Sequence, residues 1–306
     1  MNLDLDGDAH EFGRQARRAF AAAGGDALVV QAQSAPQHRE APGGPGPLAG
    51  LGAWELDPRG DAADLEAAAA LCRSAGYFAL PYPLAERLAA PADLEVDGLI
   101  VVGGARPAGA VVGLESRWAA VTLAGERYAV TGLGDTQPGL IAEVELARLD
   151  GDGAGDVALG LVLPCWTLLG MLDRAVELTV AHVGLRQQFG RPLSAFQGVQ
   201  FQLTDAEVER AGLDILATHA LWSIATDQPG AVDDALALRM AALEAADVAF
   251  RVCHQLHGAV GFCDETTLSW LSRYSQPLRR LPLGLSGTRD HLTRRAGRRG
   301  LAGLFT

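Results

Sequence analysis

The second half of the chain, from Pro164 onward, carries apolar residues at helical spacing almost to its end. This spacing predicts three long helices and two shorter ones, interrupted by glycine and proline. They are expected over residues 164–186, 197–226, 232–257, 265–274 and 288–301. Because short loops join the three long segments, we expect them to pack as an antiparallel bundle.

The first half of the chain is patterned less regularly. Residues 8–23 predict a short amphipathic helix with Phe12 and Phe20 on its apolar side, and the alanine-rich residues 61–76 predict another. A Gly/Pro-rich stretch over residues 41–47 predicts a loop or linker between them. Pro81 and Pro83 then end the helical pattern and favour extended backbone.

Residues 98–150 change character again, to short β-favouring runs. These runs are Gly98–Val102, Trp118–Leu123 and Tyr128–Thr131, and Gly, Pro and polar turns separate them. Such a pattern predicts a small antiparallel sheet.

Length, charge and cysteine use limit the class of protein. The chain has 306 residues, 49% of them hydrophobic, which allows one large domain or two or three small ones with a sizeable core. Its net charge of −12 argues against a nucleic-acid partner, whose phosphates would be repelled. No signal peptide and no apolar run long enough to span a membrane is recognised. Four cysteines without paired spacing (Cys72, Cys165, Cys253 and Cys263) indicate buried free thiols in a reducing cytoplasm.

The segment between the first two long helices carries a candidate binding motif. It reads Arg186-Gln-Gln-Phe189-Gly-Arg-Pro-Leu-Ser-Ala-Phe196-Gln197. Gly190 and the following proline mark a helix stop and restart, so a loop is expected here. An arginine offers a fork of donors to phosphate, which favours a phosphate-bearing ligand. For this loop alone, an arginine that merely caps the helix carbonyls is the alternative.

A second motif, Gln255-Leu-His257-Gly258-Ala259-Val-Gly-Phe262, ends the third long segment. Together the two motifs resemble the C-terminal helical domain of the acyl-CoA dehydrogenase family. In that family they bind the pyrophosphate and ADP part of an FAD held mainly by the neighbouring subunit. The resemblance thus implies that seven residues contact FAD across a subunit interface: Arg186, Phe189, Gln197, Gln255, His257, Gly258 and Ala259.

The same resemblance implies a mainly α fold of the acyl-CoA dehydrogenase type, with three parts. These are an N-terminal helical domain over residues 1–97, a reduced middle β-domain over 98–155 and a C-terminal antiparallel helical bundle over 156–306. A metal site at His254 and His257, with Cys253 and Cys263 nearby, is an alternative for the second motif. The resemblance instead places His257 at the turn facing the flavin.

Two departures from the family pattern restrict the function. The segments that hold the isoalloxazine ring of a subunit's own flavin are missing. The family's catalytic carboxylate is replaced by Ser286 at its usual position, and by Gly160 at the position that some relatives use. The carboxylates closest in sequence, each expected to be a cap or a surface acid, are Asp156, Asp264, Glu265 and Asp290. The resemblance therefore implies that this chain supplies no catalytic residue.

These features point to the short, non-catalytic subunit of a heteromeric acyl-CoA dehydrogenase, inactive alone. The resemblance is to the small subunits of bacterial α2β2 enzymes that desaturate CoA esters of steroid side chains. A longer partner would supply the base and the ring-binding loops, and would bind most of the acyl-CoA substrate. Two alternatives stay open: a self-sufficient homomeric flavoenzyme that uses one of the stray acids, and a flavin-free helical scaffold.

Overall fold

The protein is described by a computed structural model that covers residues 4–29, 46–104, 106–110, 117–137 and 141–299. Its first part is helical, with α1 (Gly7–Ala22), α3 (Pro47–Gly50), α4 (Ala62–Tyr77) and α5 (Leu84–Leu88). Asp6 and Asp61 cap α1 and α4 by accepting the backbone N–H groups two residues ahead. Both predicted helices are confirmed. Most of the predicted linker lies outside the described residues.

A five-stranded sheet follows, in the order β1-β3-β4-β5-β2. Its strands are β1 (Gly98–Val102), β2 (Ala108–Ala110), β3 (Trp118–Thr122), β4 (Glu126–Gln137) and β5 (Ile141–Asp152). The three predicted runs lie in β1, β3 and β4. The expectation of a purely antiparallel sheet is wrong, because β1 and β3 pair in parallel with Gly98 opposite Trp118. The reason is topological: β2 pairs with β5 at the far edge, so the chain returns to β3 by a crossover.

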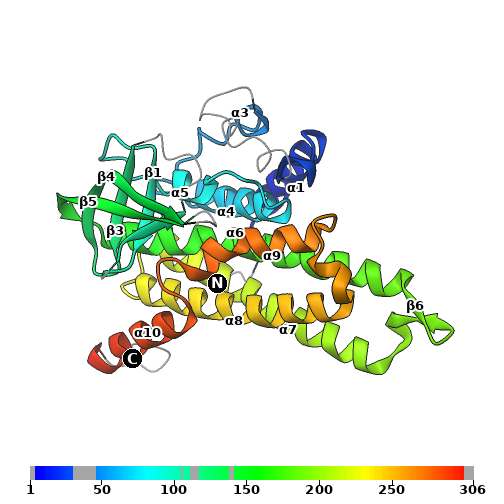
Figure 1. Cartoon of the computed structure of the whole chain (residues 1–306). Helices are drawn as coiled ribbons and strands as arrows, with labels where there is room; N and C mark the ends of the chain where they lie inside the picture. Colours follow the sequence, from blue (N-terminus) through cyan, green and yellow to red (C-terminus); the bar gives the residue numbers. More distant parts are fainter. Residues whose placement is uncertain (1–3, 30–45, 105, 111–116, 138–140, 300–306) are drawn as a thin grey trace.

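The remaining long elements form the helical bundle, with α6 (Ala154–Leu185) at its centre. The others are α7 (Gln197–Ala225), α8 (Ala231–His257), α9 (Thr267–Arg280) and α10 (Leu285–Arg299). In Figure 1, α6 runs from the sheet at one end of the molecule to a protruding hairpin at the other. The predicted mainly α bundle is confirmed.

Helix α6 starts ten residues before its predicted start, because Pro164 lies inside the helix instead of at its first turn. It is long and apolar enough to pass a length test for a membrane span, but 78% of the apolar window is buried inside the protein. That burial is typical of a core helix. Two glycines let α4 and α6 cross closely: a Cβ on Gly76 would lie 1.9 Å from the Thr167 carbonyl oxygen, and one on Gly170 would lie 1.8 Å from that of Arg73.

The three parts of the chain are joined at Asp156, in the first turn of α6. Its side chain is 1% exposed and lies between two arginines. Arg127 of β4 donates to one carboxylate oxygen at 2.7 Å. Arg59, which precedes α4, lies 2.8 Å from the other oxygen as an ion pair without hydrogen-bond geometry. Asp156 is therefore a structural junction between the N-terminal helices, the sheet and the bundle.

Candidate functional site

The loop after α6 is a β-hairpin and not a simple break between helices. Strands β6 (Gln187–Gln188) and β7 (Arg191–Pro192) pair with Gln188 opposite Arg191. Phe189 and Gly190 form the two-residue turn with φ of 53° and 77°. Positive φ at both central residues is the mark of a type I′ hairpin turn. The sequence predicted the interruption correctly but not the hairpin, because Phe is an unusual residue at the first turn position.

Phe189 combines backbone strain with exposure. A bulky residue in the left-handed region costs of the order of 1–3 kcal/mol. Its side chain is nevertheless 91% exposed, and its ring only meets the edge of the Phe196 ring, with centroids 6.2 Å apart. The isolated chain thus holds an apolar ring in water on a strained backbone. Strain of this kind concentrates at ligand clamps and contact sites.

Positive charge gathers around this hairpin. Arg186 ends α6, where its N–H donates to the His182 carbonyl at 2.8 Å. Its side chain and that of Arg191 are exposed, and in the described part of the chain no carboxylate pairs with either. The Arg191 guanidinium lies 4.1 Å over the Phe196 ring. Both arginines are therefore available to an anionic group.

The N-terminus of α7 is a second feature that attracts anions. The short 3-10 helix η2 (Leu193–Ala195) leads into α7, and no side chain caps its N-terminus at Phe196. Gln197 is the first residue of α7 and is exposed. The open N–H groups and the positive end of the helix dipole at such a terminus favour phosphate. These residues therefore fit the pyrophosphate of a dinucleotide.

The second motif forms the turn that ends α8. Gly258 has φ 64° and ψ −147°, a conformation open almost only to glycine, and it starts the 3-10 helix η3 (Gly258–Phe262). Gln255, Gly258 and Ala259 are exposed. The Nδ1–H of His257 donates to the Cys253 carbonyl at 2.9 Å. The turn therefore presents backbone and the Gln255 amide to solvent from a fixed position.

A histidine stack joins the two motifs. The rings of His182 on α6 and His257 on α8 lie 4.3 Å apart and nearly parallel. Burial lowers the pKa of both imidazoles, and the neighbouring His257 and Arg186 lower the pKa of His182 further. Two neutral rings stack without repulsion. The structure thus brings the turn after α8 beside the last turn of α6, one turn before Arg186.

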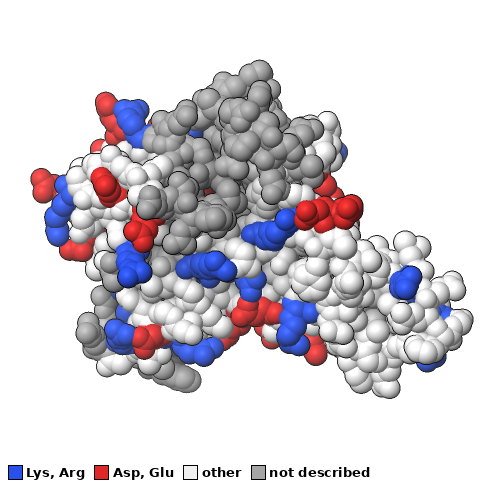
Figure 2. All heavy atoms as spheres, viewed as in Figure 1, with Lys and Arg blue, Asp and Glu red and all other residues white. Residues whose placement is uncertain are grey.

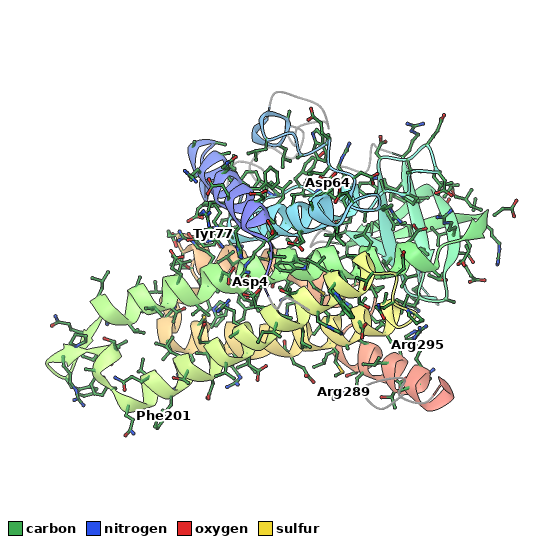
Figure 3. All side chains as sticks on the ribbon, turned by 180° about the vertical axis from the view of Figure 1, so that it is seen from behind. Asp4, Asp64, Tyr77, Phe201, Arg289 and Arg295 are labelled. Atoms are coloured by element: carbon green, nitrogen blue, oxygen red, sulfur yellow. The ribbon has the colours of Figure 1, made fainter. Side chains whose placement is uncertain are left out.

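The surface around both motifs is unusually apolar. Figure 2 shows few charged side chains on the hairpin end of the molecule, compared with the sheet end. The exposed apolar side chains on α6, the hairpin, α7 and η3, here called the apolar surface, are Val180, Leu185, Phe189, Phe201, Val208, Ile215, Leu216, Val260 and Phe262. Figure 3 shows Phe201 pointing away from the body of the protein. Patches of this kind mark protein contact sites.

The chain is similar in sequence to known proteins. Residues 162–300 match the family model of the acyl-CoA dehydrogenase C-terminal domain. Two proteins of Mycobacterium tuberculosis illustrate the likeness in sequence. Acyl-CoA dehydrogenase FadE27 is 32% identical over 188 residues, which are 56% of this chain and 49% of that protein. Acyl-CoA dehydrogenase FadE28 is 37% identical over 92 residues, which are 30% of this chain and 27% of that protein. The matched segments thus span about half or less of these relatives.

Solved structures extend the likeness to the whole chain. The ChsE4-ChsE5 complex from Mycobacterium tuberculosis contains a chain with a TM-score of 0.73 at 18% identity, covering 97% of this chain and 99% of that one. A chain of the Tcur3481-Tcur3483 steroid ACAD has a TM-score of 0.75 at 18% identity, covering 95% and 98%. The protein has the acyl-CoA dehydrogenase fold. The fold predicted from the two motifs is confirmed.

The structure gives each of the four acids considered from the sequence a defined position. Asp156 is held between two arginines where the N-terminal helices, the sheet and α6 meet. Asp264 pairs with Arg273 at 2.7 Å, and Asp290 pairs with Arg294 within α10. Glu265 is exposed. Ser286 lies exposed in the first turn of α10, and Gly160 lines a cavity beside β1.

Glu86, on α5, is a carboxylate that sequence reasoning did not single out. It lines the same cavity as Gly160, together with Arg239 of α8. Glu86 lies three residues after Pro83, but nothing in the sequence shows that this segment folds against α6 and α9. Only the tertiary structure places the carboxyl group there.

The metal alternative has no support from the described residues. No group of three or more His, Cys, Asp or Glu side chains there is arranged to hold a metal ion. The His254 ring stacks instead on Phe262 at 4.2 Å. All four cysteines are free, and three of them are buried as predicted. Cys263 is exposed, contrary to the prediction. It directly follows the short helix η3 at the surface.

Proposed function

We propose that this chain is the non-catalytic subunit of a heteromeric, FAD-dependent acyl-CoA dehydrogenase. A longer subunit holds most of the flavin, binds the acyl-CoA substrate and supplies the base. This chain contributes Arg186, Phe189, Gln197 and the turn after Gln255 to the nucleotide half of that flavin. When bound, the flavin would supply the hydride acceptor, and the partner's base the proton acceptor, for the α,β-desaturation of a CoA thioester.

The hairpin tip is the observation that carries this proposal. Phe189 is exposed, Arg186 and Arg191 pair with no carboxylate among the described residues, and no described side chain caps the N-terminus of α7. Together they form a site for a partner that is both apolar and anionic. In the complex, Arg186 would hold a phosphate of the flavin, and the N-terminus of α7 beside Gln197 would stabilise the same charge. Burial of Phe189 against the partner offsets its backbone strain.

The names of the structural neighbours support the substrate class and the assembly. The ChsE4-ChsE5 and Tcur3481-Tcur3483 structures are each named for two proteins, and the second is named a steroid ACAD. These names support an assembly of two different proteins and a steroid-related substrate. From the resemblance of the two motifs we further propose an α2β2 organisation, a cytoplasmic location and a CoA ester of a steroid side chain as substrate.

The test is flavin retention in the co-expressed complex. The chain is produced with a full-length acyl-CoA dehydrogenase encoded nearby, and FAD per complex is measured from the visible spectrum. Arg186→Ala is expected to lower FAD occupancy several-fold at limiting flavin, since a charge-assisted hydrogen bond is worth about 1.5–3 kcal/mol. Arg289→Ala is the matched control, because Arg289 is exposed on α10 and pairs with Glu244.

Three results would contradict the proposal or a part of it. Unchanged occupancy in Arg186→Ala would remove that residue from the flavin site. Stoichiometric FAD in the chain purified alone would favour the homomeric flavoenzyme, whereas a folded complex that never binds flavin would favour the scaffold.

A further inference from the structure

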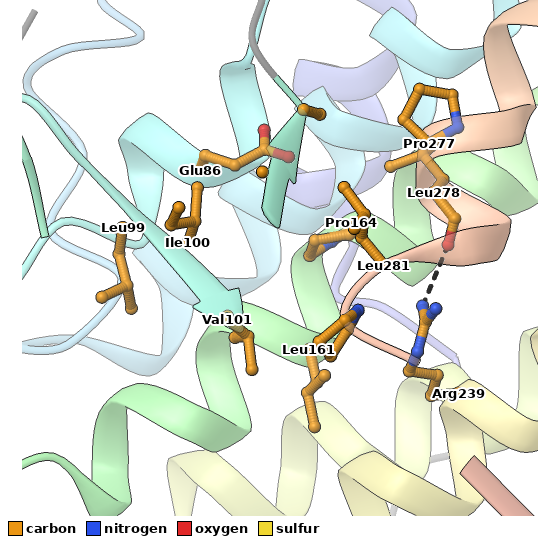
Figure 4. A pocket seen from close by; sticks show the side chains of 14 residues that line it. Glu86, Leu99, Ile100, Val101, Leu161, Pro164, Arg239, Pro277, Leu278 and Leu281 are labelled. Carbon is orange, nitrogen blue, oxygen red and sulfur yellow. Dashed lines mark hydrogen bonds between the residues drawn. The ribbon is translucent and has the colours of Figure 1, made fainter. Parts of the chain in front are cut away.

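A cavity lies between the segment after α1, the end of α4 and the start of α9. Its volume is about 350 Å³, compared with about 40 Å³ for the cavity beside Gly160 that Figure 4 shows. Its described lining residues include neither Gly160 nor any of the seven residues assigned to the flavin. Because an engineered apolar protein cavity of about 150 Å³ binds benzene, this cavity has room for an aromatic ring with a side chain.

Part of the cavity wall is apolar. Phe78 and Ala79, which follow α4, are 9% and 2% exposed and line the cavity. The Trp270 ring of α9 lines it as well. Aromatic side chains offer large apolar surfaces against which another ring packs in offset or edge-to-face geometry. This wall therefore favours an apolar, aromatic ligand body.

The polar part of the wall contains Asp26, in the segment after α1. Its Oδ2 accepts a hydrogen bond from the Thr267 hydroxyl at 2.9 Å and pairs with Arg174 of α6 at 3.2 Å. Its Oδ1 is buried and has no hydrogen bond in the described structure. Buried polar atoms are almost always satisfied, because an unmet acceptor there costs free energy. The Asp26 Oδ1 atom therefore calls for a donor from a bound molecule.

The lining side chains offer acceptors and no free donor. The Thr267 hydroxyl donates to Asp26, and the Trp270 indole N–H donates to the Asp264 carbonyl at 2.6 Å. The Asp264 carboxylate pairs with an arginine of α9, whereas Glu265, also in the wall, pairs with no cation among the described residues. A complementary ligand therefore brings N–H donors, and the charge of Glu265 favours a cation.

We propose that this cavity binds a primary ammonium ion carried on an apolar, aromatic body. The ammonium group donates to Asp26 Oδ1 and faces the charge of Glu265, while the aromatic body packs against Phe78 and Trp270. An ammonium ion has three donors and no acceptor, which matches a wall that offers only acceptors. The site goes beyond the proposed flavin function and does not depend on it.

The experiment measures binding of phenethylammonium to the full chain, in whatever assembly it forms, by isothermal titration calorimetry. A salt concentration of about 0.15 M screens unspecific attraction to a chain of net charge −12. Two matched probes are 2-phenylethanol, a neutral molecule of the same shape, and the N-trimethylated cation, which keeps the charge but lacks N–H donors. The wild type is expected to bind phenethylammonium saturably and about tenfold more tightly than either probe, the scale of one charge-assisted hydrogen bond.

Two variants test the named residues. Asp26→Asn should lower the affinity for phenethylammonium about tenfold. Its fold should persist, because Arg174 keeps its pairing with Glu177 at 2.9 Å. Glu265→Gln, at an exposed position, should lower the affinity several-fold without affecting the fold. Asp150→Asn on β5 is the matched control and should leave the affinity unchanged, because Asp150 is exposed and does not line the cavity.

Three outcomes would overturn the proposal. The first is a lack of saturable phenethylammonium binding to the folded wild type, which would mean that the cavity holds only water. The second is equal affinity for the three probes. The third is an unchanged affinity in Glu265→Gln or in a folded Asp26→Asn variant. None of these outcomes depends on flavin, so they are distinguishable from failure of the subunit assignment.

Discussion

At the scale of single residues, Asp156 shows how a candidate catalytic acid can be a structural one. Its carboxylate is buried between Arg59 and Arg127. Removing the negative charge of Asp156 takes this ion-pair partner away from both arginines. We expect Asp156→Asn to lower the free energy of unfolding by about 3–5 kcal/mol, the usual cost of breaking a buried ion pair. Urea denaturation followed by circular dichroism measures this change.

The matched control for that variant is Asp150→Asn, because Asp150 is exposed on β5. It should change the free energy of unfolding by less than about 0.5 kcal/mol. Equal stabilities for the two variants would contradict the assignment of Asp156 as a junction.

Glu86 makes the stability of the protein depend on pH. Burial raises its pKa in the folded state, so the folded protein retains a proton that the unfolded chain releases near pH 4.3. Its contribution is full below that pH and is lost as the pH rises through the raised folded pKa. We therefore expect Glu86→Gln to gain stability relative to the wild type between pH 4 and pH 7.

Urea midpoints measured across that pH range test this expectation. Glu143→Gln, at an exposed position on β5, provides the comparison, and its curve should run parallel to that of the wild type. A parallel curve for Glu86→Gln as well would show that the carboxyl group is not buried in solution.

At the scale of elements, one substitution in the β6–β7 hairpin should have opposite effects on the stability of the chain and on flavin binding by the complex. Phe189 has φ 53°, which Asn adopts with less strain. We expect Phe189→Asn to raise the stability of the isolated chain by about 1 kcal/mol and to weaken FAD retention in the complex. Thermal unfolding of the chain alone and the visible spectrum of the complex give the two readouts. A loss of stability in the isolated chain would refute the strain argument.

The stack of His182 on His257, which joins the ends of α6 and α8, makes the stability of the protein depend on pH. Both pKa values are lowered in the folded state, chiefly by burial, so the unfolded chain binds more protons near pH 6. Stability from this pair is present above pH 6.5 and is lost as the pH falls through the lowered values. We expect His182→Phe to flatten the decline in urea midpoint between pH 7 and pH 5. A slope in His182→Phe equal to that of the wild type would contradict this pH dependence.

The elements also show what the sequence could predict. The long helices were foreseeable because apolar residues that recur every three or four positions over many turns form a continuous stripe only on a helix. The start of α6 could not be predicted in this way, because Pro164 is tolerated inside this helix. The parallel pair β1–β3 and the strand β5 depend on contacts between distant segments, which local pattern does not encode. In the candidate site, Arg186 and Gln255 were found through motif order, whereas the strain at Phe189 and the cavity at Glu86 required the fold.

At the scale of the whole molecule, the apolar surface and the charge distribution predict how the chain assembles. The net charge of −12 keeps copies of the chain apart, yet α7 exposes Phe201, Val208 and Ile215, which are spaced by seven residues and so lie on one helical face. An apolar face of this kind marks a surface that another chain covers in the assembled protein.

We therefore expect Val208→Asp to prevent assembly with the longer subunit, because a buried unpaired charge costs several kcal/mol. Size-exclusion chromatography with light scattering should then show the two subunits separately, and FAD should be lost from the mixture. Leu133→Asp is the matched control, because Leu133 is 44% exposed on β4, outside the apolar surface. If Val208→Asp assembles normally while remaining folded, the partner binds elsewhere and the α7 face is not the interface. If it abolishes assembly while Arg186→Ala lowers only flavin occupancy, the apolar surface provides affinity for the partner and the arginine provides affinity for the nucleotide.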